Sequence, residues 1–184
     1  TALITGASSG MGLAIAEALA TAGMNLAITA RRAELLDVVA GTARVHGVDV
    51  LAAPVNVSDR EAAFAFAQTA LDQFGKIDVL VNNAGTNSAP RTTAEIDPDD
   101  WDHVIRVNLT GAFNFAHALI PPMRQAGGGL IVNIASTAAL IPSGMAGSAY
   151  SASKAGMRAL TININDEEWR NHIRATAIHP GETD

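Results

Sequence analysis

The sequence predicts an α/β protein with a single doubly wound parallel sheet of six strands, in one domain that spans residues 1–184. Short apolar segments alternate six times with helical segments, and the strands are near-continuous apolar runs of the kind buried on both faces. A length of 184 residues fits one domain with a sizeable core, and the chain contains no internal linker or short repeat.

Composition excludes several classes of function. The net charge of −6 argues against a nucleic-acid-binding surface, and Arg31-Arg32 is the only adjacent basic pair. The absence of cysteine excludes disulfides and thiolate metal sites, and the five histidines lack the spacing of metal ligands. With no long apolar run and no leader, we expect a soluble, cytoplasmic protein without a membrane segment. Because the chain opens at Thr1, inside an expected strand, we also expect it to be truncated at its ends.

The first strand and helix enclose a glycine-rich turn. Thr1–Thr5 is an apolar run, Met11–Ala22 has helical composition, and Gly6-Ala-Ser-Ser-Gly-Met-Gly12 connects them. A strand, a glycine-rich turn and a helix in this order predict a phosphate-binding site, because free helix N–H groups favour an anion and glycines permit close approach. The turn alone is a weak signal, since many turns need glycine only for a positive φ.

The second strand, Asn25–Ala30, ends at Arg31-Arg32, before a helix expected over Ala33–Val45. In dinucleotide-binding units an acidic residue about 20 residues beyond the glycines binds the ribose 2′-hydroxyl, whereas an arginine accommodates a 2′-phosphate. Arg31 lies 19 residues past Gly12 and no carboxylate precedes it, so the sequence favours NADP over NAD. The alternative is that both arginines merely cap or solvate the next helix.

Two further strand and helix pairs follow. Val48–Val55 is expected to be the third strand, and Ser58–Glu61 resembles a capping box for a helix that continues to Phe74. Asp78–Val81 is the fourth strand, and the polar loop 86–96 lies where open α/β sheets place their ligands. Asp97 as N-cap and Pro98 in the first turn predict the start of the next helix.

Asn108 falls on the apolar stripe of that helix, which runs through Trp101, Ile105, Ala112 and Ala116. A buried carboxamide needs hydrogen-bond partners, so Asn108 is either a structural bridge or a polar group facing a site. Spacing alone favours the structural interpretation.

The last elements place two more polar groups. Pro121-Pro122 and Gly127–Gly129 are expected to end the helix, and Leu130–Ala135 is the fifth strand. Ser136 lies just past its carboxyl end, where a serine is commonly a turn or cap residue. The loop 137–148 leads to a helix over 149–170, and the sixth strand, Ile173–Ile178, ends at His179-Pro-Gly181.

Tyr150, the only tyrosine, is followed by Lys154 four residues later in the helix over 149–170. Residues at this spacing share one face of a helix, and a nearby positive charge favours the phenolate. The pair is a plausible acid/base device, although the same spacing also occurs by chance.

Together these motifs resemble the short-chain dehydrogenase/reductase family over the whole chain. The matching stretches are Thr5–Gly12, Asn82-Asn-Ala-Gly85, Asn108, Ser136, Tyr150-x-x-x-Lys154 and Pro180-Gly181. The resemblance implies a Rossmann fold and an oxidoreductase that transfers a hydride between NADP, or NAD, and a carbonyl or secondary-alcohol substrate. Two alternatives are a nucleotide-sensing or scaffold protein of the same fold without turnover, and an NAD-dependent dehydrogenase.

The resemblance also implies a role for each catalytic residue. Tyr150 would be the general acid, or the base in the reverse direction, and would also contact the cofactor. Lys154 would favour its phenolate and bond the nicotinamide ribose. Ser136 would hold the substrate oxygen. Asn108 would support a water relay to Lys154, which changes its interpretation from structural to functional.

Cofactor contacts are implied along the whole chain. The pyrophosphate would lie against Gly6, Ser8, Ser9, Gly10, Met11 and Gly12, and the 2′-phosphate against Arg31 and Arg32. Asn56-Val57 would frame the adenine, although many relatives carry Asp where Asn56 stands. Asn82 and Gly85, with Ala84 in the same turn, would lie near the adenosine ribose, and Pro180-Gly181 under the nicotinamide amide.

The resemblance further implies association through the helices over 98–120 and 149–170, as a homodimer or homotetramer. Family members normally continue past residue 184 into a substrate-covering loop, so the sequence leaves the substrate and the direction of reaction open.

Overall fold

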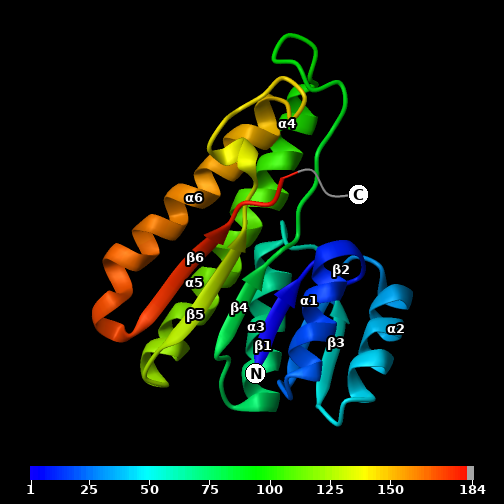
Figure 1. Ribbon diagram of the computed structural model, residues 1–184, viewed down its shortest axis with the longest axis vertical. Helices are drawn as coiled ribbons and strands as arrows, with labels where there is room; N and C mark the ends of the chain where they lie inside the picture. The colour runs from blue at the N-terminus through cyan, green and yellow to red at the C-terminus, as the bar shows by residue number, and fades with distance from the viewer. Residues whose placement is uncertain (182–184) are drawn as a thin grey trace.

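The computed structural model describes residues 1–181, and its six strands form one parallel sheet in the order β3-β2-β1-β4-β5-β6 (Figure 1). The strands are β1 Ala2–Thr5, β2 Leu26–Ala30, β3 Val50–Pro54, β4 Val79–Asn82, β5 Gly129–Ile134 and β6 Ile173–Ile178. All five strand pairings are parallel. The predicted doubly wound sheet is therefore confirmed.

Six α-helices connect the strands within residues 1–181. They are α1 Gly10–Thr21, α2 Ala33–Arg44, α3 Arg60–Phe74, α4 Pro98–Ile105, α5 Gly111–Gln125 and α6 Ser148–Glu168. A π-helical turn, Arg106–Thr110, joins α4 to α5. None of the helices in this part of the chain combines the length and apolar character needed to cross a membrane.

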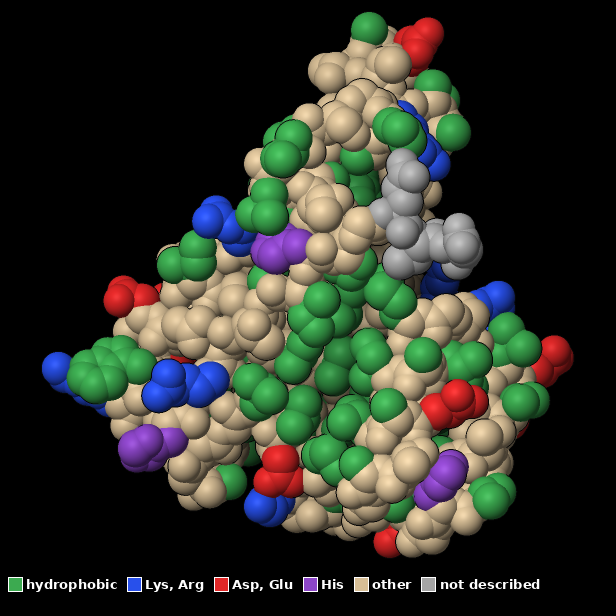
Figure 2. Space-filling model, in the orientation of Figure 1, with side chains coloured by type: hydrophobic (Ala, Val, Ile, Leu, Met, Phe, Trp, Pro, Cys, Tyr) green, Lys and Arg blue, Asp and Glu red, His purple; other side chains and the backbone are tan. Residues whose placement is uncertain are grey.

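The sheet separates two apolar cores because successive side chains of a strand point to opposite faces. Leu3 and Leu80 pack with side chains of α3, α5 and α6 on one face. Ile4 and Ile28 pack with side chains of α1 and α2 on the other. Figure 2 shows apolar side chains gathered in the middle of its view, over β4 and β5, between the helices that flank them.

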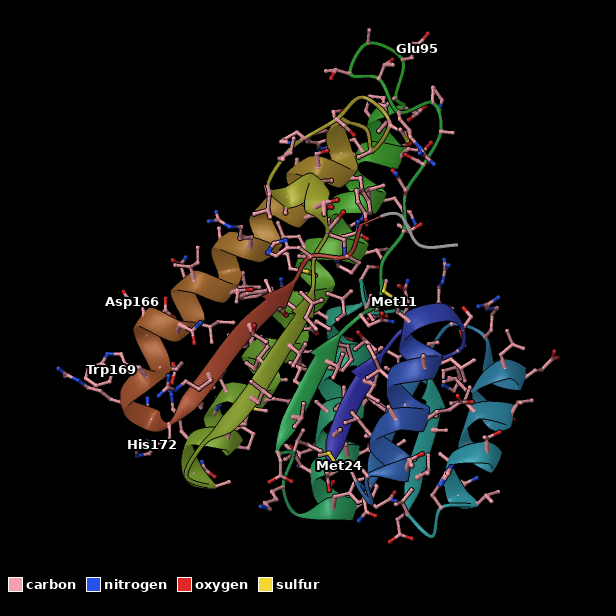
Figure 3. The ribbon with its side chains drawn as sticks, viewed as in Figure 1. Met11, Met24, Glu95, Asp166, Trp169 and His172 are labelled. Atoms are coloured by element: carbon pink, nitrogen blue, oxygen red, sulfur yellow. The ribbon has the colours of Figure 1, made fainter. Side chains whose placement is uncertain are left out.

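The sheet has its topological switch point between β1 and β4. Chain connections from β1 proceed to β2 and β3 on one side, while β4 leads to β5 and β6 on the other. The carboxyl ends of β1 and β4 therefore open a crevice, the usual ligand site of such sheets. Figure 3 shows Met11 near this end of the sheet and Met24 at the opposite end, with Glu95 at the tip of the loop between β4 and α4.

One predicted helix end is wrong. Pro121 and Pro122 lie inside α5, which continues to Gln125. Leu119 and Met123 on either side of the prolines are fully buried, and their packing offsets the missing backbone donors. Gly127 and Gly128, both with positive φ, follow the helix end, as the sequence predicts.

The start of α3 also differs from the predicted capping box. Asp59 is the N-cap, and its Oδ1 accepts a hydrogen bond from the Ala62 N–H at 3.0 Å. Ser58 instead donates its hydroxyl to Asn56 Oδ1 at 2.8 Å. The Ser58 hydroxyl closes the turn from Asn56 to Asp59 and does not cap the helix. The N-cap is therefore Asp59, one residue later than predicted. At α4, Asp97 caps the helix and Pro98 occupies its first turn, as predicted.

Candidate active site

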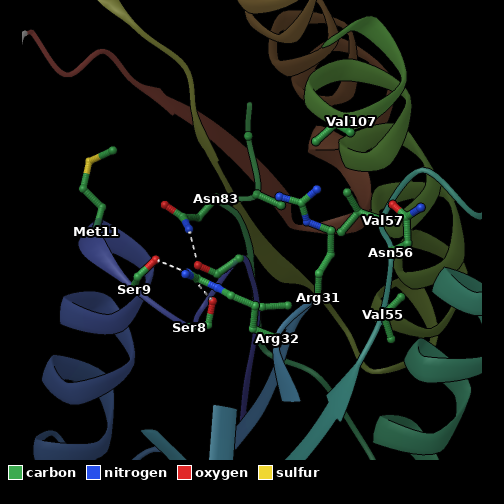
Figure 4. Close-up of a pocket in the computed structure, with 14 residues that line it drawn as sticks. Ser8, Ser9, Met11, Arg31, Arg32, Val55, Asn56, Val57, Asn83 and Val107 are labelled. Carbon is green, nitrogen blue, oxygen red and sulfur yellow. Dashed lines mark hydrogen bonds between the residues drawn. The ribbon is translucent and has the colours of Figure 1, made fainter. Parts of the chain in front are cut away.

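A cleft of about 280 Å³ lies at the carboxyl ends of β1, β2, β3 and β4 (Figure 4). Its lining combines glycines and small polar groups with two arginines and no carboxylate among the residues described: Gly6, Ser8, Ser9, Met11, Ala30, Arg31, Arg32, Val55, Asn56, Val57, Asn83, Ala84, Gly85 and Val107. The cleft therefore brings together most of the residues for which the sequence predicts cofactor contacts.

The glycine-rich turn is locked against the end of β4. Gly6 has φ +68°, and a Cβ there would lie 2.7 Å from the Ala84 Cα. Asn83 Nδ2 donates to the Thr5 carbonyl at 3.1 Å and to the Gly6 carbonyl at 3.0 Å. A side chain at Gly12 would overlap both the Gly6 carbonyl oxygen and the Asn83 amide. This cradle in front of the α1 N-terminus, which starts at Gly10, suits a phosphate group.

The two arginines occupy different parts of the cleft. Arg32 Nη2 donates to the hydroxyl of Ser9 at 2.8 Å and to that of Ser8 at 3.2 Å. Arg31 extends toward Asn56 and Val57 in Figure 4. Arg32 stands at the N-cap position of α2, but its side chain makes no capping hydrogen bond. The Arg32 side chain reaches the glycine-rich turn, and both guanidinium groups can meet an anion in the cleft. The alternative that the two arginines merely cap or solvate the next helix stays a prediction.

Asn82 departs from its predicted position near the adenosine ribose. Its side chain is only 2% exposed and points into the core, where Nδ2 donates to Asn133 Oδ1 at 2.9 Å. Asn83, the next residue, lines the cleft instead. The reason is strand alternation, because Asn82 still belongs to β4 and faces α5, whereas Asn83 lies beyond the strand. Gly10 and Gly12 shape the turn without lining the cleft.

Sequence reasoning also missed Val55 and Val107, which line the cleft as apolar walls. Val55 follows β3 directly, and that position could have predicted its place. Val107 comes from the π-helical turn, which no local pattern in the sequence indicates.

A second cleft, of about 270 Å³, is lined by three of the other predicted site residues. Ser136, Tyr150 and Gly181 line it, together with Asn87, Arg91, Thr137, Ala138, Ile141, Ser143, Met145 and Ala146. Gly181 and Pro180 follow β6, and the Pro180 carbonyl accepts a hydrogen bond from the Thr137 N–H at 3.0 Å. This bond ties the end of β6 to the segment after Ser136.

Lys154 lies beneath Tyr150 on the same face of α6. Its Nζ is 5.6 Å from the centroid of the Tyr150 ring and donates to the Ile134 carbonyl at 2.7 Å. The side chain is 3% exposed. Loss of hydration on burial lowers the pKa of Lys154 to about 8.

Asn108 is fully buried in the π-helical turn, and its carboxamide is well satisfied. Its Oδ1 accepts from the Thr86 N–H at 2.7 Å, and its Nδ2 donates to the Thr86 carbonyl at 2.9 Å and to Ser153 Oγ at 3.0 Å. These bonds make Asn108 a structural bridge between the loop after β4 and α6. A Cβ built on Gly85 would lie 3.5 Å from both Asn108 Oδ1 and Lys154 Nζ, so Gly85 adjoins both groups.

Ser136 caps the short 3₁₀ turn Thr137–Ala139, and its Oγ accepts from the Ala138 N–H at 3.1 Å. The hydroxyl proton is then free to be donated into the cleft. His179, which the sequence assigned only to the surface or core, has its Nδ1 2.9 Å from the Ser136 carbonyl oxygen. Through residues 1–181, no cluster of three or more histidine or carboxylate side chains is arranged to hold a metal ion.

Comparison with known proteins gives consistent matches. A family model described as short chain dehydrogenase matches residues 1–184. The D-beta-hydroxybutyrate dehydrogenase of Rhizobium meliloti is 36% identical over 190 residues, covering 98% of this chain and 70% of that protein.

Solved structures match equally well. A metagenomic short-chain oxidoreductase in complex with NADP superposes with a TM-score of 0.93 at 35% identity, covering 98% of this chain and 81% of the other. An NAD⁺-bound xylitol dehydrogenase superposes with a TM-score of 0.92 at 35% identity, covering 98% of this chain and 69% of the other.

Proposed function

This chain belongs to the short-chain dehydrogenase family, and we propose that it transfers a hydride between NADP(H) and a carbonyl or secondary-alcohol substrate, with Tyr150 as general acid/base. The observation that carries the proposal is the position of Lys154, which adjoins one lining residue of each cleft. Gly85 lines the first cleft and adjoins Lys154, while the ring of Tyr150 lies 5.6 Å from Lys154 Nζ and lines the second. A cofactor in one cleft would thus meet a substrate in the other.

In the reducing direction, bound NADPH would supply a hydride to the carbonyl carbon and leave as NADP⁺. Tyr150 donates its phenolic proton to the carbonyl oxygen, which completes the alcohol. Ser136 donates a hydrogen bond from its hydroxyl to the same oxygen, keeps its own proton, and so holds the oxygen near Tyr150. Proton transfer by a positioned side chain typically contributes about 10²–10⁴-fold to the rate.

Lys154 and Asn108 act behind Tyr150 in this proposal. The ammonium group of Lys154 favours the phenolate that Tyr150 becomes after proton transfer. Asn108 holds the Thr86 backbone and Ser153, and we retain the expected role in a water relay to Lys154. Its position next to Gly85, which Lys154 also adjoins, supports that role.

The cleft is lined by two guanidinium groups and, within the described residues, by no carboxylate. This lining supports NADP over NAD, because an arginine accommodates the 2′-phosphate whereas a carboxylate would bind the 2′-hydroxyl. The turn from Gly6 to Gly12 would hold the pyrophosphate, through Ser8, Ser9 and Met11 at its rim. Asn56 and Val57 would frame the adenine, and Arg31 with Arg32 would bind the 2′-phosphate. Both NADP and NAD occur among the structural neighbours, so the preference needs a direct test.

The catalytic assignment is tested by Tyr150→Phe. With NADPH and a panel of ketones and aldehydes, we expect kcat to fall by roughly 10²-fold or more, because the proton donor is lost. A fluorescence titration should show that the variant still binds NADPH, which excludes misfolding as the cause. Full activity in the variant would contradict the assignment, whereas tight NADPH binding without turnover of any substrate would favour a nucleotide-sensing or scaffold protein.

The cofactor preference is tested by Arg31→Ala. We expect the dissociation constant of NADP⁺ to rise about tenfold or more, as for the loss of a charge-assisted hydrogen bond, and that of NAD⁺ to stay unchanged. Arg158→Ala, on the exposed side of α6, is the matched control for net charge. Equal affinity for both cofactors, unaffected by Arg31→Ala, would refute the NADP preference.

Two other expectations remain proposals. A homodimer or homotetramer is supported by a groove along the outer faces of α5 and α6, lined by Phe113, His117, Ile120 and Leu160 among others. The cytoplasmic location and the assignment of residues 1–184 to one domain also stay predictions from the sequence.

A further inference from the structure

Arg91 is the only charged side chain among the described residues that line the cleft beside Tyr150. It belongs to the loop between β4 and α4, which projects past the carboxyl end of the sheet (Figure 1). The remaining lining groups are hydroxyls, one carboxamide and apolar side chains. A single cation in an otherwise neutral cleft indicates that the cleft would select a ligand with an anionic group.

The guanidinium of Arg91 is held in place by backbone oxygens. Its Nη1 donates to the Met145 carbonyl at 2.8 Å, and its Nε donates to the Ser88 carbonyl at 3.3 Å. These bonds use two of the five N–H donors of an arginine, and no ion pair to Arg91 is found within residues 1–181. The positive charge therefore keeps donors for a further partner.

The loop that carries Arg91 is fastened to the start of the helix that carries Tyr150. The Arg91 carbonyl accepts from the Ser148 N–H at 3.2 Å, and Asn87 Nδ2 donates to the Ala146 carbonyl at 2.9 Å. Gly147, at φ +86°, leaves no room for a side chain, because a Cβ there would lie 2.7 Å from the Arg91 Cβ. The cation and the phenol are thus held in a fixed relation across the cleft.

Apolar surface completes the recognition site. Ile141 is 79% exposed and Met145 is 70% exposed, and both line the cleft. Large apolar side chains at the rim of a cleft can cover the carbon skeleton of a ligand. The cleft offers a proton donor at Tyr150, an apolar wall and a fixed cation.

We infer that the substrate is a carbonyl or alcohol compound that also carries a carboxylate or phosphate group, and that Arg91 binds this anionic group while Tyr150 acts on the oxygen. The inference rests on the proposed function. It names Arg91 as the residue that selects acidic substrates over neutral ones, since a guanidinium presents several donors to a carboxylate or phosphate at once.

The test compares substrate pairs that differ mainly in charge. Initial rates with NADPH would be measured for 3-oxobutanoate and 4-oxopentanoate, each against its methyl ester, and for dihydroxyacetone phosphate against dihydroxyacetone. We expect kcat/KM to favour the anionic member of at least one pair by about tenfold or more, because charge-assisted hydrogen bonds are the strong ones. The oxo acids and the phosphate ester distinguish a carboxylate from a phosphate as the recognised group.

Variants separate recognition from loop packing. Arg91→Met should abolish the preference for the anion while the neutral member keeps its kcat/KM, and Arg91→Lys should restore part of the preference. Arg158→Met, outside the cleft, should leave every ratio unchanged. Equal kcat/KM for acids and neutral partners in the unaltered protein would overturn the inference. So would an equal loss for both members in Arg91→Met, which would mean that Arg91 only ties the two loops.

A binding experiment tests the anion site separately from the proposed function. If NADPH reduces none of these compounds, calorimetric titration of 4-oxopentanoate and of inorganic phosphate into the protein with NADPH still decides the role of Arg91. Binding that Arg91→Met weakens about tenfold supports the anion site. Absence of binding, or binding that the substitution leaves unchanged, overturns it.

Discussion

At the scale of single residues, burial of the Lys154 ammonium costs the folded protein free energy. The side chain is 3% exposed, and within residues 1–181 its one hydrogen-bond partner is the neutral Ile134 carbonyl at 2.7 Å. Burial lowers the pKa of Lys154 from 10.5 to about 8. Below pH 8 the folded protein therefore keeps a charge that the unfolded chain would hydrate freely.

The sign of the pH dependence follows from these two pKa values. Between pH 8 and 10.5 the unfolded chain binds more protons at this position than the folded one, so stability rises with pH across that window. Below pH 8 both states are protonated and the folded protein bears the full cost. This pKa difference corresponds to roughly 3 kcal/mol of stability. Removal of the ammonium also leaves the buried Ile134 carbonyl without its partner, which costs about 1 kcal/mol.

We therefore predict that Lys154→Met raises the free energy of unfolding by about 1–3 kcal/mol at pH 7 while it abolishes turnover. Urea unfolding of both proteins at several pH values should show this gain disappear as the pH rises from 8 toward 10.5. Lys76→Met is the control, because Lys76 is 62% exposed and pairs with Asp78 on the surface. A variant that is less stable than the unaltered protein at pH 7 would refute the prediction.

At the scale of elements, the connection between β3 and α3 links helix capping to the cofactor cleft. Asp59 caps α3, while Ser58 donates to Asn56, which lines the cleft. Asn114 of α5 donates its Nδ2 to the Val57 carbonyl at 3.3 Å, which fixes the next lining residue. This short segment therefore joins two helices at the expected adenine wall.

The two neighbouring polar residues give a matched pair of substitutions. Asp59→Ala should lower the free energy of unfolding by about 1 kcal/mol, because the Ala62 N–H loses its capping partner. Ser58→Ala should change stability by less than about 0.5 kcal/mol, as for a half-buried side chain with a local partner. Urea denaturation of both variants tests the assignment of the N-cap to Asp59. A larger loss of unfolding free energy in Ser58→Ala than in Asp59→Ala would instead support the capping box expected from the sequence.

The π-helical turn between α4 and α5 is another feature of element scale. It places Asn108 beside Gly85 and Lys154, and Val107 in the first cleft. Such turns often mark functional positions in helices. A regular helix through Arg106–Thr110 would rotate both side chains away from these positions.

At the scale of the whole molecule, the outer surface of α5 and α6 bears apolar and aromatic groups. Phe113 is 43% exposed, and the ring of His117 lies 5.5 Å from Phe113 and 5.7 Å from Phe64. An exposed aromatic cluster along a groove is typical of an association surface.

We expect light scattering to give a multiple of the 19.0 kDa chain mass, in agreement with the proposed homodimer or homotetramer. Phe113→Glu should shift the mass toward that of one chain, because association would bury the added charge. Glu17→Lys on the exposed side of α1 serves as a control for surface charge and should leave the mass unchanged. A monomer mass for the unaltered protein would contradict the proposal.

Much of the fold was predictable because its signals are local. Apolar runs bounded by glycine, Asp97 before Pro98, and the glycines after Gln125 each depend on a few neighbouring residues. The misplaced helix end at Pro121 shows the limit, since burial of Leu119 and Met123 in the core outweighs a local breaker signal.

By itself, the sequence determined the order of the strands and helices and the residue types that stand at strand ends. Only the tertiary structure decided which of these residues meet. In the folded chain the Asn82 side chain points into the core and that of Asn83 lines the cleft. Arg91 bonds to the carbonyl of Met145, 54 residues away in the sequence. The physical reason is that such contacts depend on strand pairing and on the packing of distant segments, which no short stretch of chain encodes.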